Sequence, residues 1–309
     1  MSDPKKHHFL PVFYLRQWAG IDGRLCQYSK PRGDLVKPLR RHPDATGYIK
    51  RLYAISGVPD ERALAFERLF MSPVDSRAAE AMTQMVDVAN AENFTNGERW
   101  AWAQFLLSLM SRMPADLRYV KKNLREDWVE AMPGLEERYQ QSRSPDDPTT
   151  FREYLDTVSD GFFEEGALRI LEQIIANQNA SRAMLSMHWS VLMADRAENP
   201  LLTSDRPIIY TMNFFGNDAH IVLPISPTRI FVAVRERTFA RAMKQKGQRE
   251  LVRILNRHVT GNADEFVYGI DDSQLRFVQN RMSGERVPTL LESIHQHRLA
   301  SAKRALVAG

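Results

Sequence analysis

The sequence predicts an α+β fold in which a helical half packs on an antiparallel β-sheet, with an N-terminal arm and a β-hairpin covering the junction. From about residue 59 to 187 the apolar residues recur with helical spacing, whereas residues 188–280 alternate apolar and polar side chains in short runs separated by short turns. Short turns between strands indicate antiparallel pairing. Because the two patterns occupy separate stretches, they favour α+β over a doubly wound α/β fold.

The 309 residues are expected to form one domain of four consecutive parts. These parts are an arm and hairpin (1–58), a helical part (59–187), an antiparallel sheet with an inserted helix (188–280) and a C-terminal helix (281–309). Hydrophobic residues make up 43% and charged residues 26% of the chain, which excludes a disordered, collagen-like or coiled-coil protein. The net charge of +4 is weak evidence for a nucleic-acid partner.

The arm is expected to begin a short helix at Pro11 and end it at Gly20, with Phe13, Tyr14 and Trp18 as apolar anchors. Two β-rich runs, 25–28 and 35–36, flank a turn-forming segment and predict a hairpin. A two-stranded hairpin is marginal alone, so it must pack on the rest of the chain.

Capping residues and prolines divide the helical part. Helices are predicted over 60–70, from Ser72, from Thr95 or Asn96, from Pro114 towards Tyr139, and over 150–187 with a break near Gly161 or Gly166; the segment 142–148 is predicted as a loop. Strands are predicted at 189–193, 201–203, 207–210, 220–223, 229–234, 265–268 and 275–278, with a helix over 238–258 and a final helix from Pro288.

Common catalytic strings are absent: the sequence has no phosphate-binding loop, no dinucleotide-binding glycine pattern, no H-E-x-x-H and no G-x-S-x-G. No apolar stretch reaches the roughly 20 residues of a membrane span, so no membrane partner is expected. The N-terminus lacks the apolar segment of a signal peptide, and the single cysteine, Cys26, excludes an intrachain disulfide. We therefore expect a cytoplasmic protein.

Short motifs in a specific order resemble a bacterial family called domain of unknown function 4238. Residues 8–18 are similar to its opening, His-x-x-Pro-x-x-Tyr-Leu-x-x-Phe, with Trp18 in place of the usual Phe. Further similar positions cover about residues 7–270: Leu52-Tyr53, Glu67, Arg112-Met113-Pro114 with Arg118, Trp189, Thr203-Ser204-Asp205-Arg206-Pro207 with Arg206 for the usual Asn, Leu223-Pro224-Ile225-Ser226-Pro227, and Asn256. The resemblance implies no particular reaction.

Four polar residues in these motifs are the candidate catalytic residues: His8, Glu67, Arg112 and Asp205. An imidazole such as His8 serves as a base, a metal ligand or a clamp that pins the arm. Glu67 and Arg112 both lie beside apolar helix positions, where each needs a partner, and the two could pair with each other. Asp205 either caps a turn after a strand or serves as a general base or metal ligand.

These residues predict a hydrolase acting on a phosphodiester or nucleotide. In this hypothesis His8 or Asp205 activates water, Arg112 stabilises negative charge, and the carboxylates could hold a divalent metal ion. The alternative is a non-catalytic binding or interaction module in which the same cluster is structural, so the sequence leaves open whether the chain is an enzyme. A third hypothesis is a basic nucleic-acid binder without catalysis, whose affinity would fall steeply with salt.

Overall fold

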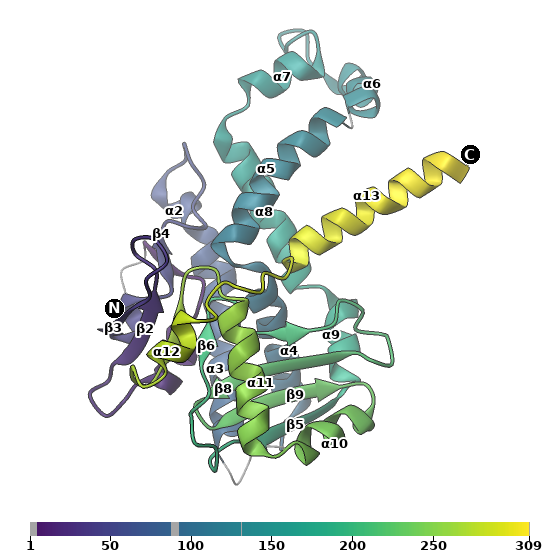
Figure 1. Cartoon of the computed structure of the whole chain (residues 1–309). Helices are drawn as coiled ribbons and strands as arrows, with labels where there is room; N and C mark the ends of the chain where they lie inside the picture. Colours follow the sequence, from purple (N-terminus) through teal and green to yellow (C-terminus); the bar gives the residue numbers. More distant parts are fainter. Residues whose placement is uncertain (1–4, 88–92, 131, 309) are drawn as a thin grey trace.

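Helices and strands occupy separate parts of the molecule, which confirms the α+β class (Figure 1). The computed structural model describes residues 5–87, 93–130 and 132–308. Within these residues the strands form three antiparallel sheets, in the orders β1-β4, β3-β2-β10-β6 and β5-β9-β8-β7. No helix in the described part of the chain is both long and apolar enough to cross a membrane.

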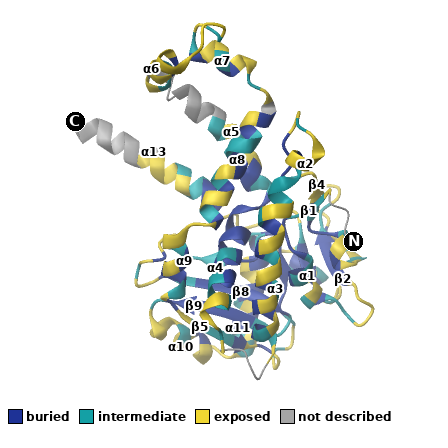
Figure 2. Cartoon of the chain, turned by 180° about the vertical axis from the view of Figure 1, so that it is seen from behind, coloured by how far each residue is buried: buried dark blue, intermediate teal, exposed yellow. Residues whose placement is uncertain are grey.

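The β5-β9-β8-β7 sheet is covered by helices on both faces. Its strands are β5 (His188–Met193), β7 (Ile209–Tyr210), β8 (His220–Ser226) and β9 (Arg229–Val234). Because side chains alternate along a strand, Leu223 and Phe231 pack with α3 (Ser72–Val86), α4 (Asn96–Ser111) and α9 (Gln178–Leu185), whereas Val222 and Val232 pack with α10 (Arg237–Gln245) and α11 (Gln248–Gly261). Figure 2 shows α3 and α4 on the face opposite α11. The central strands β8 and β9 are thus buried on both sides.

The N-terminal hairpin joins strands from the C-terminal half. The strands β2 (Leu25–Ser29) and β3 (Lys37–Arg41) pair with each other, and β2 also pairs with β10 (Val267–Gly269), which pairs with β6 (Thr203–Ser204). The second hairpin strand therefore lies after the predicted 35–36, where Val36 is buried in the core under this sheet. A small third sheet, β1 (Lys6–His8) with β4 (Tyr48–Lys50), was not predicted.

The arm is fastened to the sheets by buried aromatic side chains. It contains α1 (Val12–Leu15) and a 3-10 turn (Arg16–Trp18). The Tyr14 hydroxyl donates to Pro224 O at 2.8 Å and lies 2.7 Å from Thr203 Oγ1, and Trp18 Nε1 donates to Leu201 O at 2.8 Å. Both rings are fully buried. The arm is therefore part of the main hydrophobic core.

The helical part begins with α2 (Asp60–Ala63) and a π-helical turn (Glu67–Met71) that runs directly into α3, so no break separates the two helices predicted around Ser72. The helix α4 begins at its Thr95 cap, where Thr95 and Glu98 form a capping box. Next come α5 (Pro114–Glu130), α6 (Met132–Ser142), α7 (Phe151–Thr157) and α8 (Asp160–Ile175). In Figure 1 the helices α5 to α8 project away from the sheets.

Further predicted elements differ from the structure. The helix predicted over 150–187 is divided before Gly161, at Val158 and Ser159, and again before α9, where Asn177 caps the new helix. The helix predicted over 238–258 is two helices separated at Gly247, whose φ of 75° is incompatible with a continuous helix. The strand predicted at 275–278 is the helix α12 (Leu275–Gln279), in which Leu275 and Val278, three residues apart, pack in the same apolar cluster as a helix places them.

The chain ends in α13 (Leu290–Ala308), which begins near the predicted Pro288. Its first turn is closed by Thr289 and Glu292, each of which bonds to the backbone N–H of the other. Leu290 and Leu291 are buried, and the helix then projects away from the sheets (Figure 1). The segment before it lies against α11, where Glu285 N–H donates to Gly261 O at 2.8 Å.

Candidate functional site

Arg112 forms the buried centre of the candidate site. It caps the C-terminal end of α4, its side chain is 0% exposed, and its guanidinium lies 5.7 Å from the centre of the Phe105 ring. Phe105 and Arg112 are two helical turns apart, which places the arginine on the apolar side of α4 as the sequence predicted. The guanidinium is therefore held where water has little access, and its charge needs partners from the protein.

The ion-pair partner of Arg112 is Asp75 rather than Glu67. Arg112 Nη1 donates to Asp75 Oδ1 at 2.8 Å, and Asp75 comes from the first turn of α3. Arg112 Nε and Nη2 are buried and have no hydrogen-bond partner among the described residues. One edge of this guanidinium thus remains unpaired, although a guanidinium has five donors in a fork that fits a carboxylate or a phosphate.

Glu67 lies in the π-helical turn that leads into α3, close enough to interact with both members of this ion pair. Burial, and secondarily the negative charge of Asp75, raise the pKa of Glu67 to about 7, against the attraction of Arg112. Glu67 Oε2 has no hydrogen-bond partner in the described part of the chain. A carboxyl group with a pKa near neutrality can both donate and accept a proton under physiological conditions.

His8 reaches the same cluster from β1. Burial lowers the pKa of His8, and the positive charges of Arg112 and Lys6 lower it further, against a hydrogen bond to the Asp44 backbone. The Nε2 atom is buried and lacks a hydrogen-bond partner among the residues described. A neutral ring whose proton faces the Asp44 backbone carries its lone pair at Nε2, which makes this atom the basic one.

His7 and Tyr53 connect the arm to Arg112. His7 points to the opposite side of β1 from His8, is fully buried and stacks on the Tyr53 ring, and its Nδ1 accepts from Tyr53 N–H at 2.9 Å. The Tyr53 hydroxyl donates to Arg112 O at 2.9 Å. These contacts join the arm to the end of α4, and sequence spacing alone did not single out His7.

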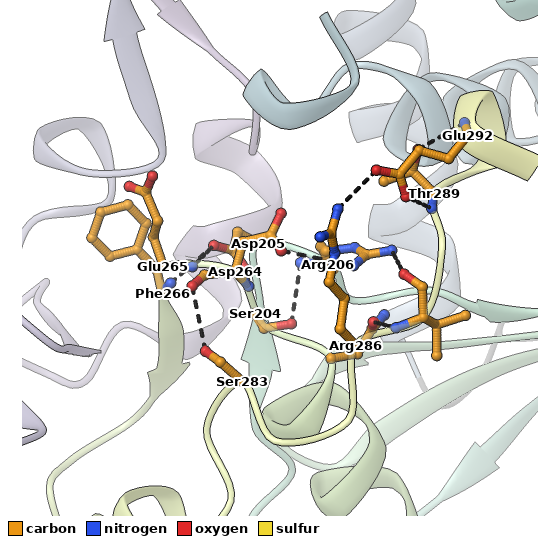
Figure 3. A network of polar contacts seen from close by, with 12 residues as sticks. Ser204, Asp205, Arg206, Asp264, Glu265, Phe266, Ser283, Arg286, Thr289 and Glu292 are labelled. Atoms are coloured by element: carbon orange, nitrogen blue, oxygen red, sulfur yellow. Dashed lines mark hydrogen bonds and ion pairs between the residues drawn. The ribbon is translucent and has the colours of Figure 1, made fainter. Parts of the chain in front are cut away.

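Asp205 lies apart from this cluster, at the end of β6 (Figure 3). Its Oδ1 accepts from Asp264 N–H at 2.9 Å, and its Oδ2 accepts from the N–H groups of Glu265 and Phe266 at 2.6 and 2.9 Å. Burial raises the pKa of Asp205 to about 7, whereas these backbone donors lower it. Asp205 therefore holds the segment before β10 against β6, which is the turn-capping interpretation of the sequence.

The profile of the family described as "Protein of unknown function (DUF4238)" matches residues 6–273 of the 309. The chain belongs to the DUF4238 family. Neither the curated proteins nor the solved structures include a match to it. The family assignment confirms the resemblance of the ordered motifs, and three of the four candidate residues taken from them, His8, Glu67 and Arg112, lie together in this DUF4238 protein.

The carboxylates Glu67 and Asp75 are the groups of this cluster that could contact a divalent metal ion. Asp75 is already bonded to Arg112, and in the described part of the DUF4238 chain no three His, Cys, Asp or Glu side chains are arranged to hold a metal.

A further buried acid, Asp116, was not among the residues predicted from the sequence. It lies in the first turn of α5 and is 1% exposed, and burial raises its pKa to about 7, against a hydrogen bond from Thr289. An acid in a first helical turn ordinarily stabilises the positive end of the helix dipole at the surface. Only the packing of α13 against α5 shows that this one is enclosed.

Proposed function

We propose that this DUF4238 protein is a hydrolase that acts on a phosphodiester or nucleotide at Arg112, Glu67 and His8. The observation that carries the proposal is the unpaired edge of the buried Arg112 guanidinium. Beside it lie Glu67, whose pKa burial raises to about 7, and His8, whose pKa burial lowers, which favours the neutral and basic ring. Unpaired buried donors are rare in proteins, and a catalytic role or a bound ion is one of the explanations for them. We place the reaction in the cytoplasm, since the only cysteine, Cys26, excludes an intrachain disulfide.

In the proposed reaction two phosphate oxygens accept hydrogen bonds from Arg112 Nε and Nη2. His8 Nε2 takes a proton from water as the water oxygen attacks phosphorus, and protonated Glu67 gives its proton to the leaving oxygen as the P–O bond breaks. Transfer of the proton from His8 to Glu67 restores both groups. General acid–base catalysis of this kind contributes about 10²–10⁴-fold to a rate.

Access to the guanidinium requires a side chain to move. Arg112 Nε and Nη2 are buried, whereas His8 and Glu67 are partly exposed. An anion therefore reaches the arginine when His8 or Glu67 turns aside. Both groups then lie beside the bound phosphate, as acid–base catalysis requires.

The second candidate function is a non-catalytic binding module in which the cluster only fastens the arm. The Arg112–Asp75 ion pair and the Tyr53–Arg112 hydrogen bond favour it, because both join separate segments without any ligand. Removing one partner of a buried ion pair typically costs about 3–5 kcal/mol. The two functions thus predict different effects of replacing Glu67, whose Oε2 has no hydrogen bond. A catalytic Glu67 is needed for turnover, whereas a structural Glu67 is needed for stability.

The test measures hydrolysis of bis(p-nitrophenyl) phosphate and of 2′,3′-cyclic nucleotides by the wild type and by Glu67→Gln, His8→Asn and Arg112→Lys. Glu61→Gln is the matched control, because Glu61 is exposed on α2. We expect Glu67→Gln to lower kcat at least 100-fold with an unchanged or higher Tm, and Glu61→Gln to behave as the wild type. Turnover that survives in Glu67→Gln and His8→Asn contradicts the proposed roles. A wild type that hydrolyses neither substrate, with a Tm loss in Glu67→Gln, supports the structural alternative.

A further inference from the structure

The helix α10 lies in a strongly basic segment at one end of the β5-β9-β8-β7 sheet (Figure 1). Residues 235–246 include five Lys or Arg side chains and one acid, Glu236, an excess equal to the net charge of +4 of the whole chain. The buried side of the helix consists of Met243 and Ala240, which pack in the apolar cluster between the sheet and α11. The basic side chains of α10 therefore lie on its exposed sides.

Four of these cations form what we call the basic stripe: Arg235, Arg237, Arg241 and Lys244. The last three are spaced i, i+4 and i+7, which places them on one side of the helix over ~10 Å of its length. Arg237 Nε donates to His188 Nδ1 at 3.3 Å, and Arg235 Nη1 donates to Ser186 Oγ at 2.6 Å. The basic stripe thus lies on the side of α10 next to the start of β5.

The basic stripe is not neutralised by acidic side chains. None of its four cations forms an ion pair with a described residue, whereas on the neighbouring α11 Arg249 pairs with Glu198 and Arg253 pairs with Glu250. Like charges at i and i+4, such as those of the stripe, destabilise a helix. The four cations therefore remain available to a partner that carries several negative charges.

An exposed aromatic ring lies on the other side of the same helix. The Phe239 ring stacks on the His220 ring, with centroids 4.6 Å apart and planes at 18°, yet Phe239 is 40% exposed. His220 of β8 and His188 of β5 both pair with Val234 at the end of β9, so the two sides of α10 are about 10 Å apart, which is two strand spacings. A chain of nucleotides that crosses the first turn of α10 spans both sides.

This combination of charge and aromatic surface fits a nucleic acid better than a membrane. A helix that lies in a membrane surface needs a free apolar face, and the apolar face of α10 is occupied by the core. Proteins that bind single strands combine cations that follow the phosphates with aromatic rings on which bases stack. The basic stripe provides the cations, and Phe239 provides the ring.

We propose that the basic stripe and Phe239 form a binding surface for single-stranded nucleic acid. The phosphates lie on the cations of the stripe, and one base stacks on the exposed part of the Phe239 ring. This surface gives a location to the basic nucleic-acid binder considered from the sequence. It uses none of the residues at Arg112 and does not depend on the proposed hydrolase activity.

The test measures the fluorescence anisotropy of a labelled oligo-dT of about 12 nucleotides, within the site sizes of single-strand binding domains, on titration with the full-length protein. Four neutralised phosphates predict that log Kd rises with log salt concentration with a slope of about 3, so the affinity should fall about 50-fold between about 50 and about 200 mM salt. The double variant Arg237→Gln, Arg241→Gln should bind at least fivefold more weakly, with a slope lower by about 1.4.

The matched control is Arg138→Gln with Arg152→Gln, which removes the same charge from exposed positions on α6 and α7, helices that project away from the sheets (Figure 1). It should bind as the wild type does. Phe239→Leu should bind at least fivefold more weakly at an unchanged slope, because a base–aromatic stack is lost, whereas Phe239→Tyr should retain binding. Glu67→Gln should also retain it, which separates this surface from the hydrolase proposal.

The inference is overturned if the wild type shows no saturable binding of oligo-dT, if the control double variant loses as much affinity as the stripe variant, or if Phe239→Leu binds as tightly as the wild type. Equal affinity for a duplex of the same length contradicts the stacked base. Binding to phosphatidylserine vesicles without binding to oligo-dT overturns the inference in favour of a membrane surface. The substituted side chains of the stripe and of its control are exposed, so the Tm of these variants should stay within about 2 °C of the wild type.

Discussion

Replacing Tyr14 by Phe removes one oxygen atom from the contact between the arm and the sheets. The Tyr14 hydroxyl donates to Pro224 O and therefore accepts from Thr203 Oγ1, and both Tyr14 and Thr203 are 0% exposed. The phenylalanine ring keeps the packing but leaves two buried partners without their hydrogen bonds. Each such group costs about 1–3 kcal/mol, so we expect the free energy of unfolding to fall by about 2–6 kcal/mol.

For a large domain about 1 kcal/mol shifts Tm by ~2–4 °C, so Tyr14→Phe should lower Tm by at least about 4 °C. Circular dichroism at 222 nm gives Tm, and urea titration gives the free energy with an unchanged m-value. Tyr154→Phe is the matched control, because the Tyr154 ring packs among other aromatic rings while its hydroxyl makes no hydrogen bond to the described residues. A Tm for Tyr14→Phe within 1 °C of the wild type would refute the idea that these bonds fasten the arm.

Two further predictions concern the buried acids. Asp205→Ala removes the acceptor of three backbone N–H groups and should lower the free energy of unfolding by about 2–5 kcal/mol. The control is Glu265→Ala, at an exposed neighbouring side chain, which should change the free energy of unfolding by less than about 0.5 kcal/mol. Thermal unfolding of both variants tests this prediction. The pKa of Asp116 is raised to about 7 in the folded protein, above the ~3.9 of an unfolded chain, so the group's contribution to stability falls as pH rises from about 4 to 7. Asp116→Asn should therefore be more stable than the wild type at pH 8, by on the order of 4 kcal/mol, and the difference should shrink towards pH 5. Equal Tm differences at both pH values would contradict a buried, ionisable Asp116.

The candidate site was predictable in part. Apolar neighbours in helical spacing placed Glu67 and Arg112 on buried faces, and the ordered motifs brought in His8 from the arm. The partner of Arg112 was not predictable, because Asp75 lies 37 residues earlier and reads as an ordinary first-turn acid of α3. Which of two carboxylates meets an arginine depends on how two helices cross, and no local pattern records that crossing.

The sequence by itself determined those helices and strands of this protein that depend on local interactions. The alternation in β8 and β9 and the capping box at Thr95 and Glu98 involve residues a few positions apart, so a short window contains all of the relevant physics. The tertiary structure alone decided that the N-terminal hairpin pairs with β10, more than 200 residues later, and that Asp205 meets the 264–266 backbone. It also enclosed Asp116 beneath the segment before α13. Those contacts depend on which distant surfaces are buried together, and burial is a property of the whole packed chain.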